Sequence, residues 1–243
     1  RLRCTGRRSC PPQRVADDRS GRHRGLAWSN GRVGRVRVTR VIRRAVVWYS
    51  VRNRRAKGRA ISTWMDQRGC RTVLLIGTLG RDDTNPNSAI VENAITPGRQ
   101  VVAGVNIVRC ETDYPFVRGD ARALPLRSGA ADFGLANAII EHVGDEDDQQ
   151  RMVDEMTRAS RCWVITTPNK WFPIEAHTST AFLHWAPSWR AKHVDEFSRL
   201  LSRREFRRLL PAGTVVSGQW WSPTFTAYYD ASVDQARSAR PAG

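Results

Sequence analysis

Short runs of apolar residues recur from residue 72 onward, separated by longer polar or amphipathic segments. The run at 72–76 (TVLLI) is continuously apolar, which is typical of a central parallel strand buried on both faces. Further apolar runs predict strands at 100–105, at Phe116-Val117, at 130–138 and at 162–166.

Helical spacing of apolar residues fills the intervals between these runs. Between residues 145 and 159, Met152, Val153 and Met156 recur at helical steps below an acidic first turn, which suits a helix N-terminus. A short helix is also expected at 88–95, entered through Asn85-Pro86-Asn87, and a longer one at 193–210. The alternation of strand and helix predicts an α/β, Rossmann-like fold, with the ligand crevice at the carboxyl ends of the strands.

The last apolar segments have a different spacing. Residues 215–220 and 224–229 are strand-like and separated by only a few residues, so they predict a closing antiparallel hairpin. We assign 72–230 to one domain and 231–243 to a frayed tail.

The front of the chain contains one clear pattern, at 33–51. Apolar residues recur there at three- and four-residue steps with arginines between them, which predicts a basic amphipathic helix. We favour a leading helix that packs on the sheet and keeps its arginines in water. An anionic membrane surface, a nucleic acid and a lid over the substrate are the open alternatives. A second short helix is expected at 60–66, within a basic helical region at 26–71, and residues 1–25 are expected to be disordered.

The charge of the chain is unevenly distributed. The formal net charge is +17, yet residues 1–71 hold 21 Lys and Arg against 3 Asp and Glu, so the remainder is nearly neutral. A patch for an anionic partner would therefore have to come from the front third.

Cysteine spacing and hydropathy restrict the class of protein further. The five cysteines are scattered without a C-x-x-C spacing, so we predict reduced thiols and neither a disulfide framework nor a metal site. Because no apolar run approaches the ~18 residues of a membrane span, we expect a soluble, cytoplasmic protein.

Two segments, GDARALPLRSGAADFGLANAIIEHV (119–143) and TPNKWFPIEAHT (167–178), carry a resemblance. They resemble the middle and substrate-side parts of class I S-adenosylmethionine-dependent methyltransferases of the type 11 group, over roughly residues 71–229. The resemblance implies a seven-stranded, mostly parallel sheet and S-adenosyl-L-methionine as cofactor.

The resemblance also implies which residues hold the cofactor. The glycine loop is divergent, because the family has a richer G-x-G-x-G loop. An amide replaces the acid that grips the ribose in the family, and only seven residues separate Asn106 from Tyr114, too few for the usual crossover helix. The implied cofactor-binding residues are Gly77 and Gly80 at the methionine end, Asn106 at the ribose, Asp120 and Ala121 at the adenine, and Asn137 near the sulfonium.

Glu141-His142 is the sharpest candidate for catalysis. An imidazole near the sulfonium is a suitable general base, whereas a cap on the next helix is the structural alternative. The pair and His177 also resemble the metal ligands of small-RNA 2′-O-methyltransferases, but Ala138 replaces the first ligand, so no metal is predicted.

The aromatic segment 167–187 is the expected substrate-binding loop, with Trp171, Glu175, His177 and His184 as candidates. The predicted acceptor is an oxygen or nitrogen of a small-molecule, glycan or lipid-type substrate. The alternatives are a methyltransferase-like binding module without cofactor and an RNA methyltransferase that uses the basic front region. A nicotinamide oxidoreductase is disfavoured because no G-x-G-x-x-G opens a helix.

Overall fold

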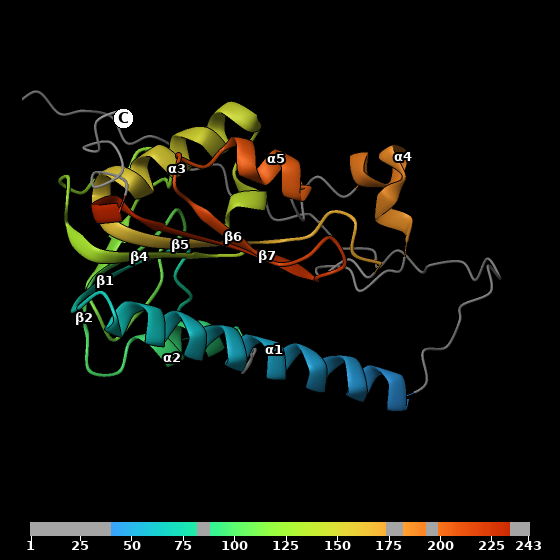
Figure 1. Ribbon diagram of the computed structural model, residues 1–243, viewed down its shortest axis with the longest axis horizontal. Coiled ribbons are helices and arrows are strands. Elements are labelled where there is room, and N and C mark those ends of the chain that lie inside the picture. Colours follow the sequence, from blue (N-terminus) through green and yellow to red (C-terminus); the bar gives the residue numbers. More distant parts are fainter. Residues whose placement is uncertain (1–39, 82–87, 174–181, 193–198, 234–243) are drawn as a thin grey trace, which may run out of the picture.

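The computed structural model describes residues 40–81, 88–173, 182–192 and 199–233, and for 40–46 only the backbone. One mixed sheet of seven strands forms the centre, in the order β3-β2-β1-β4-β5-β7-β6 (Figure 1). Neighbouring strands are parallel from β3 to β5, whereas β7 is antiparallel to both β5 and β6. The predicted fold class and the C-terminal hairpin are therefore confirmed. The strands are β1 (Thr72–Ile76), β2 (Gln100–Asn106), β3 (Phe116–Arg118), β4 (Ala131–Asn137), β5 (Ser160–Pro168), β6 (Val215–Ser217) and β7 (Thr224–Asp230).

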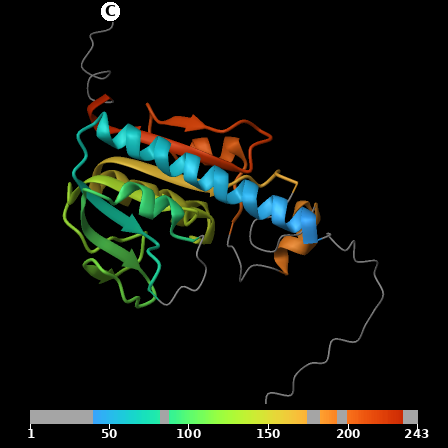
Figure 2. The same ribbon diagram turned by 90° about the horizontal axis from the view of Figure 1, so that it is seen from below.

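Helices cover both faces of the sheet (Figures 1 and 2), with α1 and α2 on one face and α3 and α5 on the other. Alternate residues of the parallel strands supply the two cores: Val73 and Leu75 pack toward α1 and α2, and Leu74 and Ile76 pack toward α3 and α5. The helices are α1 (Arg40–Asp66), α2 (Ile90–Ile95), η1 (Ile140–His142), α3 (Glu146–Ala159), η2 (Leu183–Trp185), α4 (Pro187–Ala191) and α5 (Arg203–Arg208).

The two helices expected at 33–51 and 60–66 are one continuous helix, α1, in its described part. Its C-terminal half packs on the sheet through Ile61 and Met65, which are fully buried. Tyr49, expected on the buried face, is half exposed, and the N-terminal half projects beyond the sheet (Figure 2). Packing on the sheet was expected of the helix at 33–51, whereas the structure places it on the second half of α1, and Tyr49 of the expected helix is half exposed. No helix of the described ranges is long and apolar enough to cross a membrane.

The helix expected at 193–210 is much shorter in the part that is described. Leu201 forms a bridge to Asn169, and its carbonyl accepts a hydrogen bond from the Lys170 amide at 3.0 Å, so this residue is extended. Helix α5 begins only after Ser202, whose side chain and that of Glu205 form a reciprocal capping box. The local cap and the tertiary bridge therefore override the apolar periodicity.

The link between β2 and β3 contains no helix, as its length predicted. The chain returns in an extended path, and the Gly104 amide donates to the Pro115 carbonyl at 2.8 Å. A Cβ on Gly104 would lie 2.6 Å from Cε2 of Tyr114, so the missing side chain makes room for this ring. At the other edge of the sheet, the strand expected at 215–220 is shorter than predicted, because β6 ends at Ser217 and Trp220 lies in the turn.

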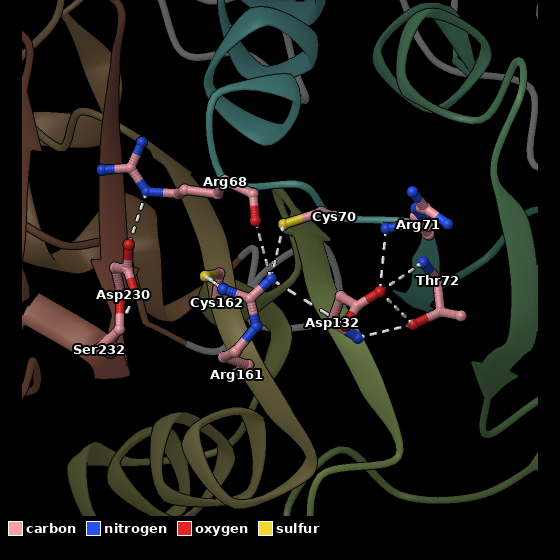
Figure 3. Close-up of polar contacts among 9 residues, drawn as sticks. All are labelled: Arg68, Cys70, Arg71, Thr72, Asp132, Arg161, Cys162, Asp230 and Ser232. Atoms are coloured by element: carbon pink, nitrogen blue, oxygen red, sulfur yellow. Dashed lines mark hydrogen bonds and ion pairs between the residues drawn. The ribbon is translucent and has the colours of Figure 1, made fainter.

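Polar contacts fasten the amino edge of the sheet (Figure 3). Arg68, just after α1, pairs with Asp230 at the end of β7 at 2.7 Å. Asp132 accepts hydrogen bonds from the amide and hydroxyl of Thr72, both at 2.9 Å, and Arg161 donates to the Arg68 carbonyl at 3.0 Å. These contacts join α1, β1, β4, β5 and β7, so the elements that carry the opposite edge are held in register.

Candidate active site at the carboxyl edge

The carboxyl ends of five strands meet along one edge. Ile76 of β1 is level with Val105 of β2 and Ala136 of β4, and Asn137 is level with Thr166 of β5. This register brings the sequence-predicted residues of the loops after β1, β2, β3 and β4 to the same edge.

Gly77 begins the loop after β1 with a φ of +72°. A Cβ at this position would lie 2.0 Å from Cδ1 of Ile139, so both the backbone conformation and the space require glycine. The Gly77 amide donates to the Val105 carbonyl at 2.8 Å, which ties the loop to β2. Gly80 follows in the same loop, just before residues outside the described ranges.

Asn106 has a structural role at the end of β2. Its Nδ2 donates to the Thr78 carbonyl at 2.8 Å, and its Oδ1 accepts from the Val108 amide at 3.1 Å. The amide side chain therefore joins the loops after β1 and β2 and uses both its donor and its acceptor. Asn106 lies where a ribose-binding residue was predicted, but its side chain already has two protein partners.

Asp120 lies in the loop after β3, beside the half-buried Ala121. Arg122 pairs with the Asp120 carboxylate at 2.6 Å and with Asp148 of α3 at 2.9 Å. The hydrogen bond from the Arg122 side chain is the main reason that the pKa of Asp120 is lowered. The carboxylate is partly exposed and ionised, so it can also accept a hydrogen bond from an amino group.

Asn137 ends β4 at a strained turn. The next residue, Ala138, has a φ of +57°, a conformation that is costly for a residue with a Cβ. Thr166 of β5 supports the turn, because its hydroxyl accepts from the Ala138 amide at 3.0 Å and donates to Asn137 Oδ1 at 2.8 Å.

Glu92 of α2 completes this network and was not identified from the sequence. Asn137 Nδ2 donates to Glu92 Oε1 at 3.3 Å. The other oxygen, Oε2, is buried and has no hydrogen-bond partner in the described part of the chain. Burial raises the pKa of Glu92, against the effects of the Asn137 hydrogen bond and of the cations Arg54 and Lys57.

Lys57 of α1 is a second residue that sequence reasoning missed. Burial is the main cause that lowers its pKa from 10.5 to about 8, and the charge of Arg54 adds to this. The carboxylates of Glu141 and Glu92 act in the opposite direction. Lys57 is half-buried, and α1 therefore brings an amine with a near-neutral pKa toward the end of β4.

Glu141 and His142 point into different environments, although they are adjacent in η1. Glu141 is fully buried, and its Oε2 accepts from the hydroxyl of Thr167 on β5 at 3.3 Å, whereas His142 is exposed. The two side chains therefore differ in their access to solvent. No group of three or more His, Cys, Asp or Glu in the described ranges could hold a metal ion.

The predicted substrate-binding loop is only partly described. Trp171 is half exposed at the edge, and His184 is almost fully buried beside Trp185 and Trp189. Neither ring nitrogen of His184 has a hydrogen-bond partner within the described ranges. Glu175 and His177 lie outside the described residues.

Comparison with known proteins supports one family. Residues 85–161 match the model of the methyltransferase domain family. None of the curated proteins matches the chain.

Several solved structures are similar in fold at low sequence identity. A SAM-dependent methyltransferase from Methanosarcina mazei is 13% identical with a TM-score of 0.42, over 65% of this chain and 90% of that one. Magnesium protoporphyrin IX methyltransferase from Synechocystis PCC 6803, with bound SAH, is 11% identical with a TM-score of 0.45, over 75% and 85%. N-methyltransferase NodS from Bradyrhizobium japonicum WM9 is 11% identical with a TM-score of 0.47, over 74% and 94%.

The strand order and the antiparallel hairpin are those of a class I S-adenosylmethionine-dependent methyltransferase fold, and residues 85–161 within it match the methyltransferase domain family. S-adenosyl-L-methionine is the cofactor that the match to this family implies. Two observations of the site fit this molecule. Asp120 is a partly exposed carboxylate that can accept a hydrogen bond from an amino group, and the buried Glu92 Oε2 is an acceptor without a partner in the described part of the chain. Asn106 departs from the family pattern, because its side-chain amide already forms hydrogen bonds with Thr78 and Val108.

Proposed function

We propose that this enzyme methylates an oxygen or a nitrogen of an acceptor bound above the end of β4. The observation that supports this choice is a group of ionisable side chains near the end of β4: Glu92 of α2 accepts from Asn137, and the charges of Glu92 and of Glu141 in η1 act on Lys57 of α1. An oxygen or nitrogen acceptor must lose a proton on methylation, so a base beside it assists the transfer.

The cofactor supplies a methyl group activated by a sulfonium. Gly77 and Gly80 would accommodate its methionine part, Glu92 and Asn137 would face its positive charges, and Asp120 with Ala121 would hold the adenine. Asn106 would contribute to the ribose site mainly by fixing the loop after β1. These roles are proposals from position and chemistry.

Lys57 is our candidate for the proton acceptor. Its pKa of about 8 leaves a substantial neutral fraction at physiological pH, whereas an ordinary lysine would be charged. The acceptor X–H would form the X–CH₃ bond, the S–CH₃ bond would break with its electron pair on sulfur, and the proton would pass to the Lys57 amine. His142 is the alternative base.

The acceptor itself would lie toward the segment after β5. Trp171 offers an aromatic surface at the edge, His184 offers ring nitrogens without described partners, and Glu175 and His177 are further candidates in the same segment. We propose a small-molecule, glycan or lipid-type acceptor in the cytoplasm. The hydrogen-bonded thiols of Cys70 and Cys162 are compatible with a reducing compartment.

Calorimetry with S-adenosylhomocysteine tests the cofactor site. We expect binding by the wild type and at least a tenfold loss in Glu92→Gln, because the buried negative charge that faces the methionine end is removed. The matched control is Asp154→Asn on α3, whose exposed carboxylate accepts a hydrogen bond from Gln150 of the same helix. No heat at millimolar ligand would exclude this proposal and favour a binding module without cofactor.

Transfer of a labelled methyl group to a panel of phenols, amines, glycans and polyprenyl phenols then tests the acceptor. Lys57→Gln should lower turnover at least about a hundredfold while leaving S-adenosylhomocysteine affinity nearly unchanged, and His142→Gln should retain most of the wild-type turnover. The reverse result would assign the proton to His142.

A further inference from the structure

Exposed apolar side chains gather at the edge of the active site. In the described ranges, the exposed large apolar side chains lie in two places, with Val215 and Val233 as the exceptions. They lie on the projecting half of α1 and in loops that follow strand ends at the carboxyl edge. Seven of them are aromatic and come from three separate segments. We call this set the aromatic rim: Trp48, Tyr49, Trp171, Phe182, Trp185, Trp220 and Trp221.

The first part of the rim lies on α1. Trp48 is 63% exposed, and the guanidinium of Arg52 lies 5.5 Å from the centre of its ring. The sequence of α1 contains seven arginines and one lysine, and its single acid is Asp66 at the last position. This half of the helix projects past the sheet in the same direction as α4 (Figures 1 and 2). It therefore presents aromatic rings and cations together.

The second part of the rim is held in place by Asn169. This buried residue follows β5, and its Nδ2 donates to the carbonyls of Trp220 and Ser222 in the hairpin turn, at 2.7 and 2.9 Å. The turn is thus fixed to the carboxyl edge while the rings of Trp220 and Trp221 remain largely exposed, packed edge to face on each other at 5.2 Å.

Trp171 repeats the combination of ring and cation. It is half exposed, and Nζ of Lys170 lies 5.4 Å from the centre of its ring. Trp185 lies farther along the same segment, and the exposed Leu183 lies beside it in η2. Rings with adjacent cations thus occur on both sides of the site.

An anionic lipid surface matches this chemistry. Tryptophan and tyrosine favour the boundary between lipid and water, and neighbouring Arg and Lys are attracted to anionic headgroups. A phosphate backbone would need the cations but would not explain exposed aliphatic side chains such as Val47 and Leu183. The front third adds an excess of positive charge from residues 1–71.

We propose that the aromatic rim docks this methyltransferase on an anionic lipid surface, with the carboxyl edge of its sheet toward the lipid. An acceptor held in or at the lipid would then reach the site above β4. This consequence for the acceptor rests on the proposed function, whereas docking does not.

Binding of the full chain to large unilamellar vesicles tests the docking without cofactor or acceptor. The probes are vesicles of phosphatidylcholine alone and of phosphatidylcholine mixed with phosphatidylserine, with sedimentation and tryptophan fluorescence as readouts. We expect binding to the anionic vesicles with a blue shift of the fluorescence. The triple variant Trp48→Ser/Trp220→Ser/Trp221→Ser should lose at least tenfold in partitioning.

Val215→Ser is the matched control, because Val215 is 65% exposed on the outer strand β6 and is not part of the rim. It should bind as the wild type does, and all variants should keep the wild-type melting temperature because these side chains are exposed.

Three results would overturn the proposal: no binding to anionic vesicles, an equal loss in Val215→Ser, or unchanged binding in the triple variant. Tight binding of single-stranded RNA that displaces the vesicles, with no effect of the tryptophans, would indicate a nucleic-acid surface instead. Because no methyl transfer is measured, a failure here is distinct from a failure of the proposed function.

Discussion

Asn106 at the end of β2 donates a hydrogen bond from Nδ2 to the carbonyl of Thr78, across 2.8 Å. The resemblance implied that an acid normally stands at this position and that the amide is a weakened version of it. The geometry gives a different reason for the amide, because a carboxylate cannot donate to a carbonyl.

Asn106→Asp should therefore destabilise the protein rather than strengthen a ribose site. The substitution removes the donor and places a negative charge against the Thr78 carbonyl, so we expect a loss of about 1–3 kcal/mol. Thermal unfolding measures this loss, and Asn106→Ala is the control that removes the donor without adding charge. Asn106→Asp should melt below Asn106→Ala. A gain in S-adenosylhomocysteine affinity with unchanged stability would contradict this prediction.

Asp120→Ala should weaken cofactor binding about ten- to a hundredfold, the magnitude of a hydrogen bond to a charged group, about 1.5–3 kcal/mol. Calorimetry with S-adenosylhomocysteine gives the affinity. Asp148→Ala is the matched control, because it removes the other partner of Arg122 and leaves the Asp120 carboxylate in place. Since the pKa of Asp120 is lowered, binding should persist below the pH at which an ordinary aspartate is protonated and then fall. Equal losses in the two variants would assign Asp120 a purely structural role.

Gly58 sets the distance between α1 and α2. A Cβ at this position would lie 2.6 Å from Cβ of Ala94, so Gly58→Ala should force the helices apart at a cost of about 1–3 kcal/mol. The gain in helix propensity, about 1 kcal/mol, offsets only part of this cost. The double variant Gly58→Ala/Ala94→Gly removes the clash and should melt above the single variant. If both variants melt alike, the two helices do not pack as described.

Lys57 should give the enzyme a pH-dependent rate. The neutral amine is the active form in our proposal, so turnover should rise with pH through about 8, and the residual turnover of Lys57→Gln should lack this rise.

The pH dependence of stability provides an independent check of the direction in which the pKa of Lys57 is shifted. A folded pKa below the unfolded value of 10.5 means that the unfolded state binds the proton more tightly, so stability should increase between pH about 8 and 10.5. Denaturant unfolding should detect this increase in the wild type and not in Lys57→Gln. A parallel pH dependence in both proteins would contradict it.

The sequence alone predicted the strands and helices that are determined by neighbouring residues in the chain. Continuous apolar runs identified the central strands, and an acidic first turn identified the start of α3, where Asp145 accepts from the Asp148 amide at 3.0 Å. The seven residues between Asn106 and Tyr114 excluded a crossover helix, because chain length limits the possible connections. The predicted fold class is correct for these reasons.

The boundaries that depend on distant contacts could not be read from periodicity. The apolar pattern continued past Leu201, but the bridge to Asn169 keeps this residue extended, and the helix begins after Ser202. Apolar spacing likewise placed Tyr49 on a buried face, although the sheet ends before α1 does and leaves that side chain exposed.

The sequence located the candidate site through the predicted strand ends. The helices that pack against these strand ends add residues to the site that the sequence did not indicate. Adjacency in the sequence paired Glu141 with His142, whereas the single turn of η1 points one side chain into the core and the other into solvent. Lys57 and Glu92 carry no local signal of function, since each is an ordinary charged residue of a helix. Only the packing of α1 and α2 on the sheet brings them to the end of β4, where burial shifts their pKa values and gives them chemistry.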